Sequence, residues 1–138
     1  MIDLTSKSGR EALNKLESER IIWLTTITPK GTPQPRPVWF IWQDGKIIIY
    51  SMPAAKKVGH IRNNPNVSLH FNMASPDSAA FVFAGEASII ETPIPAVKVN
   101  EYMQKYSEGI KSIDMTPETF GETYSVRIEI TPTKFRVN

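Results

Sequence analysis

Residues 36–51, RPVWFIWQDGKIIIYS, decide the fold. Two apolar runs flank the dipeptide Asp44-Gly45, which is the strongest short-range signal of a β-hairpin because the tight turn needs residues that tolerate a positive φ. Both runs are rich in β-branched and aromatic residues, which favour strands. We therefore predict a hairpin with strands over residues 36–43 and 46–51.

The first of these strands is apolar on both faces. Successive side chains of a strand point to opposite sides, so Val38, Phe40 and Trp42 share one face, and Trp39 and Ile41 share the other. A strand with one solvated face alternates apolar with polar residues, and this strand does not. We therefore expect another subunit, a flat ligand, or both to cover the second face, with cover by one of the chain's own helices as the alternative.

The remaining segments predict short strands interrupted by short helices. We expect strands at residues 20–28, 67–73, 79–91, 124–130 and 133–137, and helices at residues 8–19, 54–64 and 94–106. We also expect a turn at residues 29–32, a bulge or bend at Gly85, and loop with some helical turn at residues 107–122. Because the strands do not alternate regularly with helices, we predict a mainly β (α+β) fold, an antiparallel barrel of six or seven strands with flanking helices.

Length and composition indicate a single globular domain over residues 1–138. Hydrophobic residues make up 41% of the chain, which excludes a disordered protein. The absence of cysteine excludes disulfides, a thiol nucleophile and cysteine-ligated metals. No run approaches the roughly 18 apolar residues of a membrane span, and no apolar leader follows Met1, so we expect a cytoplasmic protein without a membrane partner.

Positive charge is concentrated in the first half of the chain. The formal net charge is only +2. Residues 20–76 nevertheless contain one acid, Asp44, against the seven cations Arg20, Lys30, Arg36, Lys46, Lys56, Lys57 and Arg62. Solvated surface charges would explain this run, and so would a site for an anionic ligand.

The most specific local feature is an anion site at the start of the helix predicted over residues 54–64. Ser51 ends the preceding strand, and Lys56 and Lys57 fall in the first helical turn. The N–H groups and the positive dipole end of a helix N-terminus attract anions, whereas lysines are unfavourably placed there when no anion is bound. The pattern predicts a phosphate site, with solvent-exposed lysines as the alternative.

Catalytic and metal-binding motifs are missing from the sequence. His60 and His70 fall on different predicted elements without acidic neighbours, so neither indicates a metal site. No P-loop, dinucleotide fingerprint, nucleophile elbow or zinc-protease motif occurs. If the protein is an enzyme, we expect a bound cofactor to carry out the chemical step while the protein binds and orients it. We therefore name no catalytic residue.

A series of short motifs covers nearly the whole chain, most densely between residues 25 and 69. The motifs are Gly31-x-Pro33-x-x-x-Pro37-Val38-Trp39-Phe40, Trp42-x-Asp44-Gly45, Ile49-Tyr50-Ser51-x-Pro53, Lys57-Val58-x-x-Ile61-Arg62-x-Asn64-Pro65-x-Val67-Ser68-Leu69, Gly85-x-Ala87, Tyr102, Lys105-Tyr106 and Thr131-Pro132-Thr133. In this order and spacing they resemble the pyridoxamine 5'-phosphate oxidase-like flavoproteins. Among these, the sequence looks most similar to the small flavin and deazaflavin oxidoreductases.

The resemblance implies a split β-barrel that forms a homodimer and binds FMN or coenzyme F420 in a groove between the subunits. It implies hydride transfer between the cofactor and a small planar substrate. By the same likeness, Pro37, Val38 and Trp39 flank the cofactor ring, with Tyr50 and Ser51 nearby.

The resemblance also assigns the phosphate end of the cofactor. Lys57 matches the family's phosphate-binding lysine, and Lys56 lies beside it. Arg36 is also a candidate cofactor contact, but it stands where relatives often carry a smaller residue, so the resemblance assigns it no role. The C-terminal residues 134–138 do not match the basic residues with which true pyridoxamine phosphate oxidases bind their substrate. The likeness therefore argues against vitamin B6 oxidation.

Other functions are compatible with the same residues. One is a flavin-binding protein or sensor without enzymatic activity. Another is a haem-binding split barrel with His60 or His70 as the axial ligand. A third is a barrel that binds single-stranded nucleic acid through aromatic and basic side chains. Because the aromatic residues lie in continuous apolar runs typical of buried segments, we expect no nucleic-acid partner.

Overall fold

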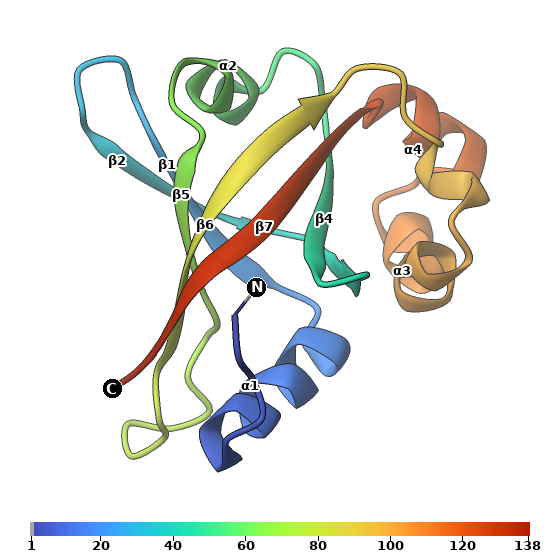
Figure 1. Cartoon of the computed structure of the whole chain (residues 1–138). Helices are drawn as coiled ribbons and strands as arrows, with labels where there is room; N and C mark the ends of the chain where they lie inside the picture. Colours follow the sequence, from blue (N-terminus) through green and yellow to red (C-terminus); the bar gives the residue numbers. More distant parts are fainter. Residues whose placement is uncertain (1) are drawn as a thin grey trace.

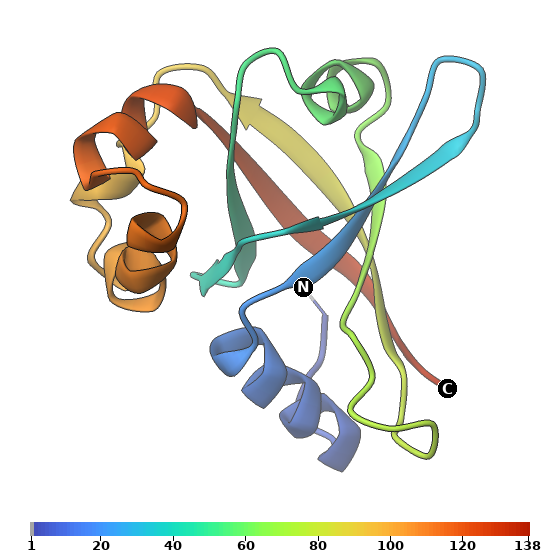
Figure 2. The same cartoon turned by 180° about the vertical axis from the view of Figure 1, so that it is seen from behind.

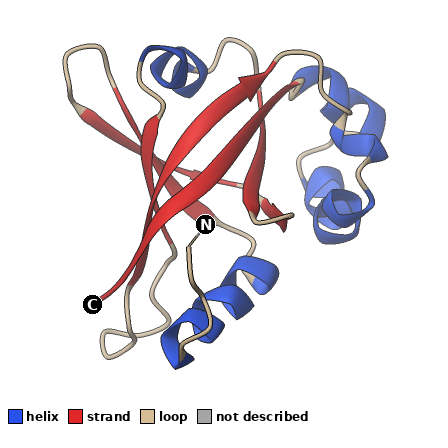
Figure 3. Cartoon of the chain, in the orientation of Figure 1, coloured by secondary structure: helices blue, strands red, loops and turns tan. Residues whose placement is uncertain are grey.

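The computed structural model describes residues 2–138, and within them seven strands form one antiparallel sheet with helices around it (Figures 1 and 3). The strands are β1 (Ile22–Ile27), β2 (Pro33–Val38), β3 (Ile41–Gln43), β4 (Lys46–Ser51), β5 (Asn66–His70), β6 (Phe81–Ile90) and β7 (Val126–Val137). The helices are α1 (Lys7–Ser18), α2 (Lys56–Asn63), the 3-10 helix η1 (Ala96–Lys98), α3 (Asn100–Ser112) and α4 (Pro117–Thr123). The predicted fold class is confirmed.

The sheet curls into a half-barrel because its two outermost strands are consecutive in the chain. In the order β2-β1-β5-β6-β7-β4-β3, only Trp39 and Phe40 separate β2 from β3. β2 pairs with β1, whereas β3 pairs with β4, so this segment crosses from one edge of the sheet to the other (Figure 2). The prediction of one unbroken strand over residues 36–43 is therefore wrong at the β2–β3 junction, where the chain bends.

The hairpin between β3 and β4 is confirmed. Asp44 and Gly45 have φ angles of 54° and 74°, as a two-residue turn of the hairpin type requires. The turn at residues 29–32 is also present, since the Gly31 amide donates to the Thr28 carbonyl at 2.8 Å. β2 starts three residues earlier than predicted, and its three prolines are tolerated because it is an edge strand.

The doubly apolar segment lies between two hydrophobic cores. The first core fills the half-barrel and includes Val38, Phe40 and Ile47. The second lies between β3, β4 and the helices η1, α3 and α4; it includes Ile41, and Trp39 packs against it. The alternation predicted for this segment is therefore correct. The cover expected from a subunit or a ligand is instead provided at Ile41 by the chain's own helices. Figure 1 shows α3 and α4 together beside β4.

Two predictions for the second half of the chain are wrong. The helix predicted over residues 94–106 is instead the short η1 followed by α3. Residues 107–122, predicted as loop with some helical turn, contain the second half of α3 and all but the last residue of α4. α4 is fixed by a capping box, in which the Thr116 hydroxyl accepts the Thr119 amide at 3.1 Å and a proline occupies the first turn.

The two last predicted strands are one continuous strand, β7. Pro132 cannot donate to a ladder, but it sits opposite Gly85, where the register between β6 and β7 shifts. The irregularity predicted at Gly85 is thus confirmed, and a Cβ there would lie 2.8 Å from Cγ2 of Ile130. The other predicted helices and strands agree with the structure to within three residues at each end. Across residues 2–138, no helix is long and apolar enough to cross a bilayer.

Candidate functional site

A polar pocket opens between the β1–β2 hairpin and α2, which are neighbours at one end of the sheet (Figure 1). Its volume is about 450 Å³, within the range of pockets that bind small molecules. The lining consists of Thr26, Thr28, Gln34, Arg36, Pro37, Ala55, Lys56, Lys57 and His60. Because this lining contains two lysines and an arginine but no carboxylate, we refer to it as the cationic pocket.

The start of α2 adds hydrogen-bond donors to the cationic pocket. A hydrogen bond of 2.9 Å between His60 Nδ1 and Thr26 Oγ1 ties α2 to β1. The N-cap residue of α2 is Ala55, whose methyl group cannot accept a hydrogen bond from the first-turn amides. The first-turn amides of Lys56 and Lys57 therefore lack a capping side chain, whereas the Val58 amide donates to the Ala55 carbonyl at 3.1 Å. Free N–H groups beside two lysine side chains suit an anion.

The positive charges of this pocket are not neutralised within the described part of the chain. None of the ion pairs formed by residues 2–138 includes Arg36, Lys56 or Lys57. Burial lowers the pKa of the Lys57 ammonium, and the nearby Arg36 guanidinium lowers it further. Both effects make a protonated Lys57 less favourable here than in water, and a bound anion would act in the opposite direction.

A second pocket, of about 420 Å³, adjoins the first. It is lined by Ile21, Pro37, Val38, Trp39, Tyr50, Ser51, Met52, Ala55, Lys57, Tyr102, Ile113, Phe120 and Tyr124. These residues come from the ends of β2 and β4, from the connection to α2, and from the region of α3 and α4. We refer to it as the apolar pocket, because Lys57 is the one charged side chain in this lining.

Trp39 forms a wall of the apolar pocket and is supported from behind by aromatic rings. Its ring stacks on Tyr106 with centroids 4.7 Å apart and planes 6° apart, and on Phe120 at 5.8 Å. Gly109 of α3 allows this close approach, since a Cβ there would lie 3.1 Å from Cη2 of Trp39. Trp39 is therefore half-buried, with its own helices on one side and the pocket on the other.

Side chains of α3 replace the strand hydrogen bonds that are lost at the β2–β3 junction. The Tyr106 hydroxyl accepts the Phe40 amide at 2.8 Å, and Lys105 Nζ donates to the Phe40 carbonyl at 2.9 Å. Nζ also lies 3.8 Å from the centroid of the Phe40 ring. Burial, assisted by Arg20, lowers the pKa of Lys105 to about 8, and burial raises that of Tyr106. These contacts fix the bend that places Trp39.

The two pockets bring together all the residues predicted to bind a cofactor. Arg36 and Lys56 line the cationic pocket; Val38, Trp39, Tyr50 and Ser51 line the apolar pocket; Pro37 and Lys57 line both. Ala55 is also shared. Lys57 therefore stands where the cationic and apolar pockets meet.

Sequence reasoning missed several pocket residues. Thr26 of β1 and His60 of α2 line the cationic pocket, and no motif in the sequence links them; His60 was named only as a possible haem ligand. Tyr102, Phe120 and Tyr124 form part of the apolar pocket. Tyr102 is among the motifs quoted from the sequence, but nothing local indicated that its helix packs beside β4.

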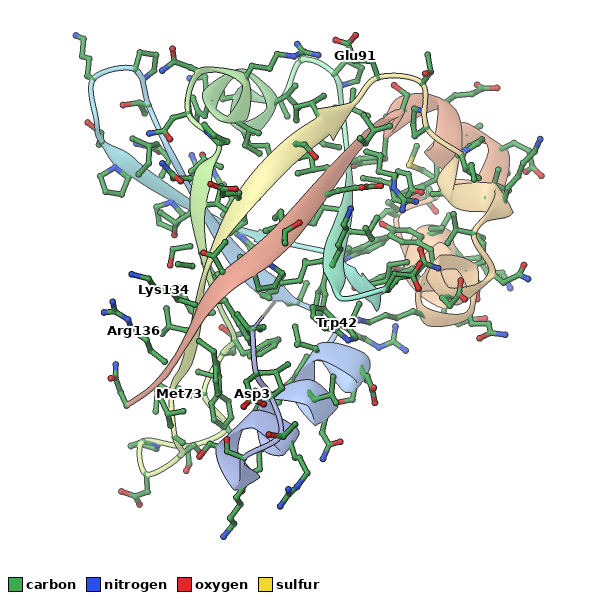
Figure 4. All side chains as sticks on the ribbon, viewed as in Figure 1. Asp3, Trp42, Met73, Glu91, Lys134 and Arg136 are labelled. Carbon is green, nitrogen blue, oxygen red and sulfur yellow. The ribbon has the colours of Figure 1, made fainter. Side chains whose placement is uncertain are left out.

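The second histidine and the C-terminal basic residues lie away from the pockets. His70 stacks on Trp23 with ring centroids 6.1 Å apart and lines neither pocket. Lys134 and Arg136 are exposed, and Figure 4 shows them across the sheet from α3 and α4. Within the described residues, no three histidine or acidic side chains gather in a way that could hold a metal ion.

The sequence matches a protein-family model over almost its whole length. The family is described as pyridoxamine 5'-phosphate oxidase, and the match covers residues 9–137. The chain therefore belongs to this family, and the resemblance stated from its motifs is confirmed. No curated protein matches the chain significantly.

Solved structures share the fold. A conserved hypothetical protein of Mycobacterium tuberculosis superimposes with a TM-score of 0.76 at 23% identity, covering 96% of this chain and 84% of the other. A structure described as F420 reductase has a TM-score of 0.68 at 24% identity, with coverages of 89% and 94%. The haem storage protein HutZ of Vibrio cholerae has a TM-score of 0.63 at 14% identity, with 92% of each chain covered.

Proposed function

We propose that this protein is an oxidoreductase that binds FMN or coenzyme F420, with the ring in the apolar pocket and the phosphate end in the cationic pocket. The observation that carries the proposal is that two pockets of opposite character meet at Lys57. A phosphate ester of a flat ring needs an apolar slot continuous with a cationic one. The family membership and the similarity to a structure described as F420 reductase support the same class.

The residues present fit such a cofactor. Arg36, Lys56 and Lys57 would hold its phosphate, since charge-assisted hydrogen bonds from arginine and lysine are strong and no lining carboxylate competes. Trp39 and Tyr50 would flank its ring, since aromatic walls stack on planar ligands.

The protein's contribution to the reaction would be binding, orientation and exclusion of water. When bound, the cofactor supplies hydride transfer to or from a small planar substrate. The apolar lining keeps water from the ring, and Lys57 at one end sets the direction in which a phosphate ester can enter. No side chain is required as an acid or base in this scheme.

We further propose that the working unit is a homodimer. Met52 and Ile113 are large apolar side chains that remain 43% and 44% exposed, and both line the apolar pocket. Exposed apolar groups around a pocket favour coverage by another surface, and a second copy of the chain would provide it. Light scattering coupled to gel filtration tests this: a mass near twice 15.5 kDa is expected, and a monomer would contradict it.

Titration of the purified apoprotein with FMN and, separately, with coenzyme F420 tests the cofactor proposal. We expect one of them to bind with a changed visible absorption spectrum and quenched fluorescence. Failure of both to bind would overturn the proposal.

Turnover separates an enzyme from a binding protein. The reduced cofactor complex would be mixed with a panel of quinone and enone acceptors, and oxidation of the cofactor followed at its absorption band. Acceptor-dependent oxidation supports the oxidoreductase. A complex that binds cofactor tightly but oxidises at the same rate with and without acceptors would favour a binding or sensor role.

Haem is the second candidate ligand. HutZ, a haem storage protein, shares the fold, and His60 lines the cationic pocket. Titration of wild type and of a His60→Ala variant with haemin tests whether the protein binds haem through His60. A haem absorption band that shifts on binding and is lost in the variant would favour haem, whereas an unchanged spectrum would exclude His60 as its ligand.

A further inference from the structure

The hydroxyl of Tyr102 has no hydrogen-bond partner in residues 2–138, although the residue is only 1% exposed. The neighbouring tyrosines differ. The Tyr50 hydroxyl donates to the Ile94 carbonyl and accepts from Arg127, each at 3.0 Å. The Tyr106 hydroxyl is bonded to the backbone of Phe40. Tyr102 thus carries a free polar group in a cluster whose other buried hydroxyls are bonded.

This free hydroxyl borders the apolar pocket. Every side-chain nitrogen or oxygen that is fully enclosed within the described chain has a partner. The Tyr102 hydroxyl has none, so it must touch open space, and the space that its side chain lines is the apolar pocket. A hydroxyl shielded from bulk water without a partner costs free energy, and a ligand that bonds to it would remove that cost.

The hydroxyl is a neutral donor at physiological pH. Burial raises the pKa of Tyr102, and the nearby Tyr106, Tyr50 and Tyr124 raise it in the same direction. Of the other hydroxyls in this lining, Ser51 Oγ donates to the Met52 carbonyl at 3.0 Å and Tyr50 donates to Ile94. The Tyr124 hydroxyl also has no partner in residues 2–138, but Tyr124 is only half-buried, whereas Tyr102 is 1% exposed. Tyr102 is therefore the buried residue of this lining whose hydroxyl proton is available to a ligand.

We propose that the Tyr102 hydroxyl donates a hydrogen bond to an acceptor atom, a carbonyl oxygen or a ring nitrogen, of the planar molecule held in the apolar pocket. The proposal rests on the proposed function, in which a ring occupies that pocket. The acceptor belongs either to the cofactor ring or to a substrate stacked on it, and the chemistry recognised is the same. Tyr102 thereby selects rings that carry an acceptor over purely hydrocarbon ones.

The test compares wild type with Tyr102→Phe, which removes one oxygen and keeps the ring. We expect the melting temperature to be no lower than that of wild type, because the hydroxyl has no internal partner to lose. If the acceptor is on the cofactor, affinity for FMN or coenzyme F420 falls about 5- to 10-fold. If it is on the substrate, cofactor affinity is unchanged and kcat/KM for a quinone acceptor falls by a similar factor.

Two results would overturn the proposal. One is unchanged cofactor affinity together with unchanged kcat/KM. The other is a drop in melting temperature as large as that of Tyr106→Phe, which would show that the Tyr102 hydroxyl is bonded inside the protein.

Failure of the proposed function is distinguishable from failure of this inference. If wild type binds neither cofactor, the proposed function fails, and a naphthoquinone becomes the probe because it has a ring and carbonyl oxygens but no phosphate. Binding that weakens in Tyr102→Phe would still support the hydrogen bond. Equal binding to both proteins, or binding to neither, would overturn it.

Discussion

The hydroxyl oxygen of Tyr106 lies 2.8 Å from the backbone nitrogen of Phe40 and 2.9 Å from its carbonyl oxygen, across 66 positions of sequence. The same hydroxyl lies 2.7 Å from the carbonyl of Arg20. The Tyr106 side chain of α3 thus bonds the backbone where the chain passes from β2, which pairs with β1, to β3, which pairs with β4. The bend, the wall formed by Trp39 and the closure of the sheet depend on this contact.

Tyr106→Phe should destabilise the fold. Phe40 would keep a buried amide without a partner, and losing a partner for a buried group costs about 1–3 kcal/mol. The free energy of unfolding in urea measures this. The matched control is Tyr102→Phe, one turn earlier on the same helix, which should show no loss. Equal effects of the two substitutions would contradict the role assigned to Tyr106.

Lys105 should make stability depend on pH. Its pKa is lowered to about 8 in the folded state, so between that pH and its ordinary value of 10.5 the unfolded chain binds more protons than the folded one. Stability contributed by this group therefore rises as the pH increases through 8. Because the side chain is partly solvated, the effect is smaller than the full shift would give.

The measurement for Lys105 is the difference in unfolding free energy between wild type and Lys105→Met from pH 7 to 9.5. The free energy of unfolding of wild type should increase relative to that of Lys105→Met as the pH rises. A flat difference would mean that Lys105 titrates normally in the folded protein. The pH range stops at 9.5 because burial raises the pKa of Tyr102 and Tyr106 in the folded state. At higher pH these tyrosines ionise more readily in the unfolded chain, which lowers the free energy of unfolding.

Gly59→Ala should stabilise the protein by about 0.5–1 kcal/mol. Gly59 lies inside α2, and a Cβ there would meet nothing within 4 Å, so alanine gains helix propensity at no steric cost. Gly9→Ala in α1 is the contrasting case, because its Cβ would lie 2.6 Å from the Leu4 backbone and should cost about 1–3 kcal/mol. Thermal unfolding of both variants checks the opposite signs.

Gly109→Ala should weaken cofactor binding without unfolding the protein. The new methyl group would lie 3.1 Å from the Trp39 ring, which must shift by a few tenths of an ångström toward the apolar pocket. Gly121→Ala in α4 is the control, since its Cβ makes an ordinary contact of 3.8 Å with Val97. We expect a several-fold loss of affinity for the cofactor in Gly109→Ala and none in Gly121→Ala.

The sequence predicted the parts of the fold that local chemistry determines. Asp44-Gly45 specifies its hairpin whatever the rest of the chain does, and the alternation of Val38, Trp39 and Phe40 between two faces follows from the strand period alone. The break between β2 and β3 could not be predicted, because it depends on Tyr106, which is distant in sequence. α4 was missed although Thr116 and the proline after it are a start signal for a helix.

The site was predicted in its composition but not in its full extent. All the candidate residues from Arg36 to Lys57 line the two pockets because they sit on one local unit, the strands and helix start of the first half. Tyr102 and Phe120 were missed as pocket residues because only tertiary packing brings α3 and α4 to β4. The second apolar face proved to be covered by these helices, with the pocket at one end.

In the proposed function, one ligand spans both pockets with its phosphate at Lys57. The direct test measures the affinities of wild type and Lys57→Ala for FMN and for riboflavin, which has the same ring without the phosphate. If coenzyme F420 is the cofactor, its phosphate-free deazaflavin core takes the place of riboflavin. Lys56→Ala, which changes the exposed neighbour, is the control and should lose less affinity.

We predict that wild type binds FMN much more tightly than riboflavin, and that Lys57→Ala weakens FMN by about 1.5–3 kcal/mol while leaving riboflavin unchanged. Equal affinity of wild type for the phosphorylated and unphosphorylated rings, or an unchanged affinity of Lys57→Ala for FMN, would contradict the account.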